Sequence, residues 1–297
     1  MTGLISVIVT TYNREDALAA VLRSLAGQKD RNFEVLVADD GSSPATAALV
    51  EQYKAGIGVP LTHVWHEDRG FRAGEIRNLA LLASRGDYVI FLDGDCLARP
   101  DFVTHHRRLA ERGWFVTGNR ALLTQALTDS VLRQGLMPEH WGLAEWLRQR
   151  VRGGLNRLAP ILRLPLGWLR KIRPHAWEGA RSCNLAVWRA DLDRVDGFDA
   201  RFSGWGKEDS DLLVRLLHAD VRRKDGAFAI GVLHLWHPEA DRSQLPINQE
   251  KLDGVLKGNC MRAERGMSTA CGGAPRIAAA SELAGPHEDS NVTSIRA

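Results

Sequence analysis

Three short clusters of acidic and imidazole side chains have the residue types to bind a metal ion and to accept a proton. Asp93-Gly94-Asp95 directly follows a hydrophobic run, and its two carboxylates can present oxygens to one divalent cation. Mg²⁺ or Mn²⁺ held by one or two carboxylates and by the phosphates of a nucleotide is a common arrangement. Because Asp and Gly also favour plain turns, the triplet by itself leaves an ordinary turn open.

The second cluster is the segment GWGKEDSDL at residues 204–212. Acidic residues are favourable at a helix N-terminus, so capping alone explains Glu208 and Asp209. It does not explain the two glycines around Trp205, which would let a ring and a backbone approach a ligand closely. A carboxylate here could accept a proton from an attacking hydroxyl. A capped helix and a functional site both remain open.

The third cluster is HLWHP at residues 234–238. Neutral imidazole is a common ligand of transition metals. Positions i and i+3 of a strand face opposite ways, so His234 and His237 reach one ion only if the chain turns, which Pro238 favours. We predict His237 as a metal ligand and keep His234 as a further candidate.

The hydrophobic pattern predicts the elements that position these clusters. Apolar runs predict strands and helical spacing predicts helices in alternation, which indicates an α/β fold with a Rossmann-like, mainly parallel sheet flanked by helices. In such sheets ligands bind beyond the carboxyl ends of the strands. The predicted strands are 4–10, 33–38, 61–65, 88–92 and 183–188, with a final apolar stretch at 227–235, and the predicted helices are 14–26, 44–54, 72–84 and 209–218.

The charge is unevenly distributed along the 297 residues. The net charge is +3, but residues 141–175 contain eight basic residues and one acidic residue, which gives +7 there and −4 elsewhere. An evenly basic chain would indicate nucleic acid, whereas this distribution indicates a charged substrate or an anionic surface and no nucleic acid. The mixture of Leu, Trp and Arg is typical of interfacial helices, so 141–175 is a candidate for contact with an anionic membrane. A solvated helical hairpin and a self-association surface are the alternatives.

Length and composition exclude several classes of protein. A chain of this size can bury a large core. Four cysteines without CxxC spacing indicate reduced thiols, and the lack of an apolar run of about 18 residues argues against a membrane-spanning helix. The first residues are typical of a strand and not of a signal peptide. We therefore expect a cytoplasmic protein, with a peripheral position on the inner face of the cytoplasmic membrane left open.

Seven segments occur in an order that resembles an inverting family 2 glycosyltransferase of the GT-A fold, and the second half is similar to the galactosyltransferase-type C-terminal module. The nearest patterns are those of chondroitin-polymerase-like and lipopolysaccharide or surface-polysaccharide transferases. The segments are 6–14, 35–42, 66–81, 88–96, 179–189, 197–216 and 234–238.

The resemblance implies a metal-dependent, inverting hexosyl transfer from a UDP-sugar to a hydroxyl of a glycan or lipid-linked glycan, with Mn²⁺ or Mg²⁺ as cofactor, in lipopolysaccharide or surface-polysaccharide synthesis. A non-catalytic sugar- or membrane-binding member of the same fold is the alternative. The roles it implies are donor binding by Thr11, Tyr12, Arg14, Asp39, Asp40, Asp68, Arg77, Asp93 and Gly94, metal binding by Asp95, His237 and the further candidate His234, acceptor binding by Trp205, Gly206 and Glu208, and proton acceptance by Asp209.

The same resemblance divides the chain into four parts. Residues 1–118 form the nucleotide-sugar-binding half, 119–176 a basic helical insert, 177–265 the acceptor and catalytic half, and 266–297 a tail that we expect to be disordered. Lys207 departs from the family pattern, in which a small residue often precedes the acidic pair.

Overall fold

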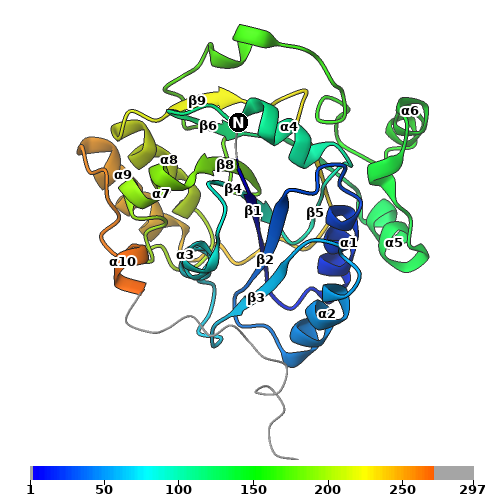
Figure 1. Cartoon of the computed structure of the whole chain (residues 1–297), viewed down its shortest axis with the longest axis horizontal. Helices are drawn as coiled ribbons and strands as arrows, with labels where there is room; N and C mark the ends of the chain where they lie inside the picture. The colour runs from blue at the N-terminus through cyan, green and yellow to red at the C-terminus, as the bar shows by residue number, and fades with distance from the viewer. Residues whose placement is uncertain (1–2, 271–297) are drawn as a thin grey trace, which may run out of the picture.

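The computed structural model describes residues 3–270, which form a central sheet with helices on both faces (Figure 1). The sheet has the strand order β3-β2-β1-β4-β8-β6-β9. Strands β3, β2, β1 and β4 are parallel, β8 is antiparallel to β4 and β6, and β9 is parallel to β6. The predicted mainly parallel sheet is thus confirmed. The strands are β1 Ile5–Thr11, β2 Phe33–Asp39, β3 Leu61–Trp65, β4 Tyr88–Asp93, β6 Trp114–Thr117, β8 Asn184–Trp188 and β9 Arg222–Asp225.

The central strands are buried along nearly their whole length because helices cover both of their faces. Alternate residues of a strand point to opposite faces, so Val7 and Val9 belong to one core cluster and Ile8 to another. The first cluster includes side chains of α1 (Glu15–Ala26), which lies beside α2 (Pro44–Lys54). The second includes side chains of the opposite layer, made by α3 (Ala73–Ala83), α7 (Arg189–Val195) and α8 (Glu208–His218).

A second, three-stranded sheet brings the end of β4 to the later part of the chain. Its order is β5-β10-β7, with β5 (Cys96–Leu97) antiparallel and β7 (Arg120–Leu122) parallel to β10 (Val232–His234). Only these last residues of the predicted apolar stretch 227–235 form a strand. The backbone N–H groups of Ala229 and Ile230 donate to the Gly226 carbonyl, so the preceding residues form a turn.

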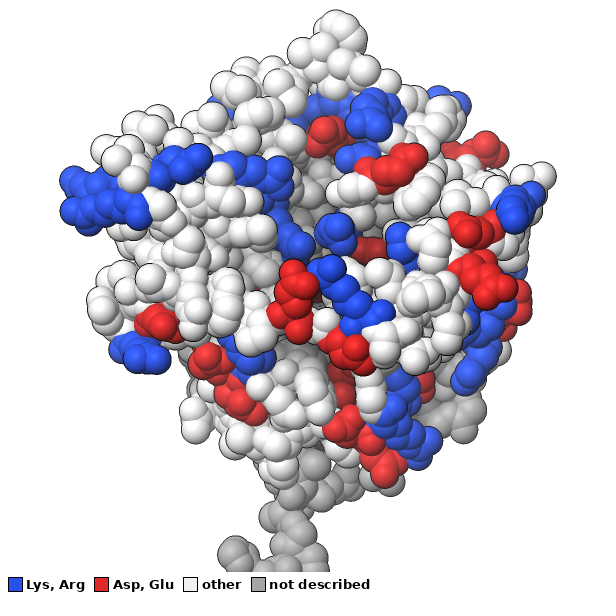
Figure 2. Space-filling view, turned by 180° about the vertical axis from the view of Figure 1, so that it is seen from behind, with Lys and Arg blue, Asp and Glu red and all other residues white. Residues whose placement is uncertain are grey.

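The insert 119–176 contains several short helices joined by loops, as its Gly and Pro residues lead one to expect. The helices are α5 (Gln125–Gln134), a 3₁₀ turn at Pro138–His140, α6 (Leu143–Val151) and a 3₁₀ turn at Gly167–Lys171. Trp146 is fully buried in the main core, whereas Val151, Trp168 and Ile172 remain 89%, 77% and 61% exposed. Figure 2, seen from behind, shows a band of Lys and Arg reaching from the side where α6 lies toward a central hollow.

The structure corrects the predicted start of the disordered tail. Residues Met267–Ala270 form the short helix α10, which contacts α3, and Met267 is buried. Ser268 is held by hydrogen bonds from its backbone N–H and its hydroxyl to the Asp196 carboxylate. The prediction for 266–297 is therefore wrong for this segment, because specific packing and hydrogen bonds compensate for its low hydrophobicity. Residues 271–297 lie outside the described residues.

Two elements complete the description, α4 (Phe102–Leu109) and α9 (Leu245–Lys257). Helix α4 buries Phe102 and Val103 in the core beside α1, and α9 packs against α8. Within residues 3–270, the helices are too short or too polar to cross a bilayer.

Candidate active site

Arg77 is the centre of a polar cluster at the carboxyl edge of the main sheet. Its guanidinium donates to Thr10 Oγ1 at 3.0 Å, to Asp93 Oδ1 at 3.2 Å and to Glu208 Oε1 at 3.2 Å. The side chain is nearly fully buried in α3. Burial alone would lower the pKa of Arg77, but the carboxylates of Asp93 and Glu208 outweigh it, so the pKa is raised. Arg77 therefore holds β1, β4 and the first residue of α8 together as a permanent cation.

Glu208 and Asp209 occupy different environments although they are neighbours. Burial and the neighbouring Asp209 raise the pKa of Glu208 to about 7, although Arg77 opposes the shift. Its second oxygen, Oε2, is buried without a hydrogen-bond partner. Asp209 is half-buried, and its oxygens accept hydrogen bonds from the backbone N–H of Ser210 at 2.7 Å and of Ser182 at 3.4 Å. Asp209 is thus oriented by the backbone and accessible, as a proton acceptor must be.

Asp95, His234 and His237 form the cluster that the sequence predicted as a metal site. Asp95 Oδ2 lies 3.3 Å from His237 Nε2 and 3.6 Å from His234 Nε2, and one ligand atom from each residue falls within 4.8 Å of the others. Burial lowers the pKa of His234, although Asp95 opposes the shift, which favours the neutral, metal-binding imidazole. One carboxylate and two imidazoles together could hold a divalent metal ion.

The pairing of β5 with β10 explains why these three side chains meet. His234 pairs with Cys96 in the ladder, and the Leu235 N–H donates to the Asp95 carbonyl at 2.9 Å. The strand then ends, and the chain brings His237 back to the same carboxylate. Both histidines therefore reach the Asp95 carboxylate, because the chain turns after the strand as the sequence analysis required.

Gly94 fixes the position of the two aspartates on either side of it. Its backbone N–H donates to the Thr10 carbonyl at 2.7 Å, and a Cβ at this position would lie 2.8 Å from the same oxygen. Only a residue without a side chain allows the turn to lie this close to β1. The nearby Thr11 Oγ1 is buried and has no partner among the described residues.

Tyr12 and Asp68 form the accessible part of the predicted donor side. The Tyr12 hydroxyl donates to Asp68 Oδ2 at 2.9 Å, and Asp68 Oδ1 accepts the Gly70 N–H. These two hydrogen bonds lower the pKa of Asp68. The backbone at Gly41 approaches that of Asp68 so closely that a Cβ would lie 2.5 Å from the Asp68 Cα. Arg14 pairs with Asp16 at 3.1 Å.

Asp39 and Asp40 are buried, and all four of their carboxylate oxygens have protein partners. Asp39 pairs with His63 at 2.8 Å and accepts the Ser42 N–H. Asp40 pairs with His66 at 2.6 Å and accepts the Arg72 N–H at 2.8 Å. These carboxylates therefore fasten the loops after β2 and β3. Sequence reasoning missed both histidines, although a His near the end of a neighbouring strand is a plausible partner for a buried carboxylate.

The loop that carries Trp205 has a left-handed backbone. Gly204, Gly206 and Lys207 have φ values of +73°, +102° and +80°. Lys207 thus adopts a conformation that glycine favours, which gives a physical reason for a small residue at this position in similar proteins. The Asn248 side chain in α9 donates to the Ser203 and Gly206 carbonyls, each at 3.0 Å, and so holds both ends of the turn.

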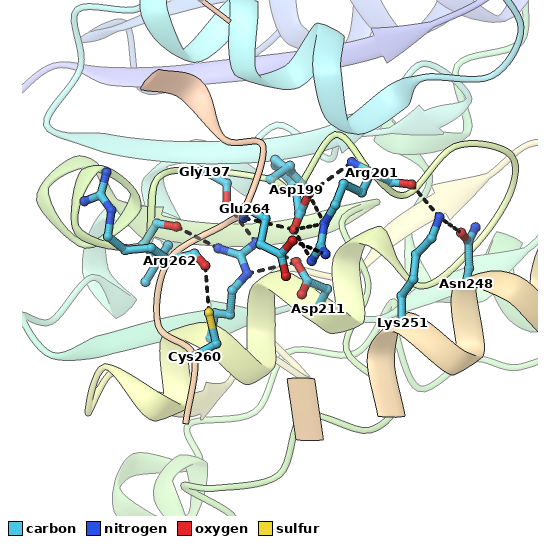
Figure 3. A network of polar contacts seen from close by, with 12 residues as sticks. Gly197, Asp199, Arg201, Asp211, Asn248, Lys251, Cys260, Arg262 and Glu264 are labelled. Carbon is cyan, nitrogen blue, oxygen red and sulfur yellow. Dashed lines mark hydrogen bonds and ion pairs between the residues drawn. The ribbon is translucent and has the colours of Figure 1, made fainter. Parts of the chain in front are cut away.

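A network of polar contacts that includes residues of α8 anchors the same region (Figure 3). The fully buried Arg215 pairs with Asp211 at 2.6 Å and donates to the Val195 and Gly197 carbonyls. Arg201 pairs with Asp199 at 2.8 Å and with Glu264 at 2.5 Å. The residues that present Glu208 and Asp209 are therefore tied to α7 and to the segment before α10.

The structure brings most predicted site residues to one edge of the sheet, and it adds one that the sequence did not reveal. Arg120, at the start of β7, interacts electrostatically with Asp93 and Asp95. No motif marks Arg120, because its position depends on the pairing of β7 with β10.

Two families match successive parts of the chain. Glycosyl transferase family 2 matches residues 6–156, which are 151 of the 297 residues, and a family described as N-terminal domain of galactosyltransferase matches residues 171–234. Validoxylamine A glucosyltransferase of Streptomyces hygroscopicus subsp. limoneus is 29% identical over 84% of this chain and 56% of its own. Chondroitin synthase of Escherichia coli is 27% identical over 76% of this chain and 34% of its own. The chain thus spans about half or less of the length of these relatives.

Solved structures show the same fold. The Staphylococcus aureus TarS 1–349 complex with UDP-GlcNAc aligns with a TM-score of 0.57 at 17% identity, covering 90% of this chain and 69% of that one. The mannosyltransferase PcManGT of Pyrobaculum calidifontis, in complex with GDP-Man and Mn²⁺, aligns with a TM-score of 0.52 at 17% identity, covering 90% and 73%. The predicted GT-A fold is confirmed, and by its sequence match this chain belongs to glycosyl transferase family 2.

Proposed function

We propose that this protein is a metal-dependent, inverting glycosyltransferase that moves a sugar from a UDP-sugar to a hydroxyl of a glycan acceptor, in lipopolysaccharide or surface-polysaccharide synthesis. The observation that carries the proposal is the meeting of three groups at one sheet edge: the Arg77 cluster, the accessible Asp209, and the cluster of Asp95 with two histidines. The TarS complex with UDP-GlcNAc and the chondroitin synthases support the donor and acceptor classes.

In this mechanism each residue has one task. Tyr12 and Asp68 contact the nucleoside, and Arg77 keeps Asp93 and Glu208 in place beside the donor. Asp95, His234 and His237 would hold a divalent ion, which would supply positive charge to stabilise the departing diphosphate. Asp209 accepts the proton of the acceptor hydroxyl while its oxygen bonds to the anomeric carbon and the bond from that carbon to the diphosphate breaks. Attack opposite the leaving group inverts the configuration.

The test of the function is release of UDP from a panel of UDP-sugars, with glycan acceptors and Mn²⁺ or Mg²⁺. Asp209→Asn should bind UDP with unchanged Kd and lose at least about 100-fold in turnover, since it can no longer take the proton. Asp220→Asn, at an exposed position just beyond the same helix, is the matched control and should transfer normally. Normal transfer by Asp209→Asn would remove Asp209 from the mechanism. No release with any donor would favour the non-catalytic, sugar- or membrane-binding alternative.

We also propose that the segment 141–175 contacts an anionic membrane on its cytoplasmic face, where a lipid-linked acceptor would lie. Trp168 and Ile172 are exposed near the exposed Arg173, which combines apolar insertion with positive charge. Flotation with phosphatidylglycerol vesicles at low salt should recover the protein, and high salt should release it. Trp168→Ser with Ile172→Ser should weaken the binding. Vesicle binding that ignores salt, or none at all, would contradict this proposal.

A further inference from the structure

A pocket of about 260 Å³ opens beside the predicted proton acceptor and is rich in arginine. Its lining comes from four parts of the chain: the end of β6, the insert, the loop before β8 and the end of β9. Arg181 lines it, and the next residue, Ser182, donates its backbone N–H to Asp209 Oδ2. Two lining residues, Arg181 and Cys183, thus flank the residue whose backbone holds Asp209. Figure 2 shows positive side chains bordering a hollow on one face of the molecule.

The charge of this pocket is strongly positive. Four of its lining residues are arginines, Arg120, Arg157, Arg181 and Arg223, and a single carboxylate, Asp225, opposes them. Among the described residues, none of the four forms an ion pair within 4.0 Å with an acidic side chain. The lining residues carry a formal net charge of 4 − 1 = +3. Asp93 and Asp95 attract Arg120 from outside the lining, and an anionic ligand would compensate the charge of the other arginines.

The arginines are placed to offer free donors. Arg157 donates to the Arg120 carbonyl at 3.2 Å, and Arg223 donates to the carbonyls of Ala176 and Glu178, so backbone contacts fix both side chains without neutralising them. Arg181 has no side-chain hydrogen bond to any described residue and is exposed. Each guanidinium carries five N–H groups, so most of the donors remain available.

We infer that this pocket binds a phosphate group carried by the acceptor, so that the acceptor class is a phosphate-bearing glycan or polyol. This inference rests on the proposed function. A ligand with a single carboxylate could not accept hydrogen bonds from all of these guanidinium groups. A phosphate group has more oxygens and a higher negative charge, and therefore matches them better. A phosphate bound beside Arg181 would place the hydroxyl of the same acceptor next to Asp209.

The experiment measures binding of inorganic phosphate to the full chain by calorimetry. Arg157→Gln with Arg181→Gln should weaken phosphate binding at least tenfold, and the lysine pair at the same positions should recover part of it. Arg148→Gln with Arg150→Gln on α6 is the matched control for lost charge and should bind phosphate within twofold of the original protein. Equal phosphate binding by both glutamine pairs, or none by the original protein, would overturn the inference.

Two further measurements separate this inference from others. UDP binding in Mn²⁺ should be unchanged in Arg157→Gln with Arg181→Gln; if it falls in parallel with phosphate binding, the pocket belongs to the donor diphosphate and the inference is wrong. Flotation of the single variant Arg181→Gln, which lies outside residues 141–175, with phosphatidylglycerol vesicles should also be unchanged; its loss would assign the pocket to lipid headgroups instead. Failure of UDP-sugar turnover with phosphate binding intact would contradict the proposed function and not the anion site.

Discussion

Arg77 donates to Glu208 at 3.2 Å although 131 residues separate them in the chain. Arg77 lies in the part that matches glycosyl transferase family 2, and Glu208 lies in the part that matches the galactosyltransferase family. The same guanidinium binds Asp93, two residues before the candidate metal ligand Asp95. One buried cation therefore fixes the geometry of the donor side relative to the acceptor side.

Glu208 should make the stability of the protein depend on pH. Its pKa rises from 4.5 to about 7 on folding, so the folded state binds the proton more tightly than the unfolded state. The stability that this proton binding contributes is fully present below about pH 4.5 and is lost as the pH rises through 7. In the original protein, Glu208 should make the free energy of unfolding in urea fall by about 3 kcal/mol between pH 5 and pH 8. The variant Glu208→Gln should lack this fall. The exposed Glu51→Gln should keep the original profile. Parallel profiles for both variants would contradict the raised pKa.

Gly94→Ala should destabilise the protein and weaken its metal site. The added Cβ would lie 2.8 Å from the Thr10 carbonyl oxygen, so the turn must move away from β1. We expect a loss of about 2 kcal/mol in denaturant unfolding and weaker Mn²⁺ binding. Gly254→Ala in α9, where the Cβ meets nothing within 4 Å, should instead stabilise by about 0.5–1 kcal/mol. The expectation fails if the two substitutions have the same sign.

Asn248 is a positioning residue for the loop around Trp205. Asn248→Ala leaves the Ser203 and Gly206 carbonyls without their donor, which should cost about 1–3 kcal/mol of stability. We expect the acceptor KM to rise while the Kd of UDP stays constant. Gln249→Ala, at the next position of the helix, loses only a hydrogen bond to Asp253 and should leave the acceptor KM unchanged. A change in kcat alone would argue against a positioning role.

Removal of the imidazoles should reduce affinity for Mn²⁺. His237→Ala leaves Asp95 and His234 as the remaining ligands, and we expect the Kd of Mn²⁺ to rise at least tenfold. Electron paramagnetic resonance of free Mn²⁺ measures this directly. His175→Ala, an exposed histidine of the insert, is the control. Unaltered Mn²⁺ binding by His237→Ala would place the ion elsewhere.

The elements of the first half could be predicted well because their apolar patterns are local. The bounds 44–54 and 61–65 are those of α2 and β3, and the other predicted strands of this half differ from the observed ones by about one residue at an end. The cluster Asp93-Gly94-Asp95 was placed correctly at the end of β4, since a parallel sheet brings such turns to one edge. The sequence also indicated that His234 and His237 could reach one ion only if the chain turned between them, and in the structure both lie close to Asp95.

What could not be predicted depends on contacts between distant segments. Nothing near Arg120 or Asn248 in the sequence marks them, because β7 reaches the site by pairing with β10 and α9 reaches the loop by packing on α8. The buried carboxylate of Asp39 has its partner, His63, on the neighbouring strand β3, and nothing near Asp39 in the sequence indicates this pairing. The short helix α10 lacks periodicity, and contacts with distant residues stabilise it: its packing on α3 and the hydrogen bonds from Ser268 to Asp196.

The network of Figure 3 also sets the smallest fragment that can retain a working acceptor side. The family match ends at residue 234, but Asn248 holds the Trp205 loop and Glu264 binds Arg201. A protein shortened at the family boundary would lose both contacts and uncover Phe202 and Val214, which pack with Leu252. Expression of isolated catalytic units from this protein, and exchange of its acceptor half with that of a relative, should therefore carry the chain through at least Glu264.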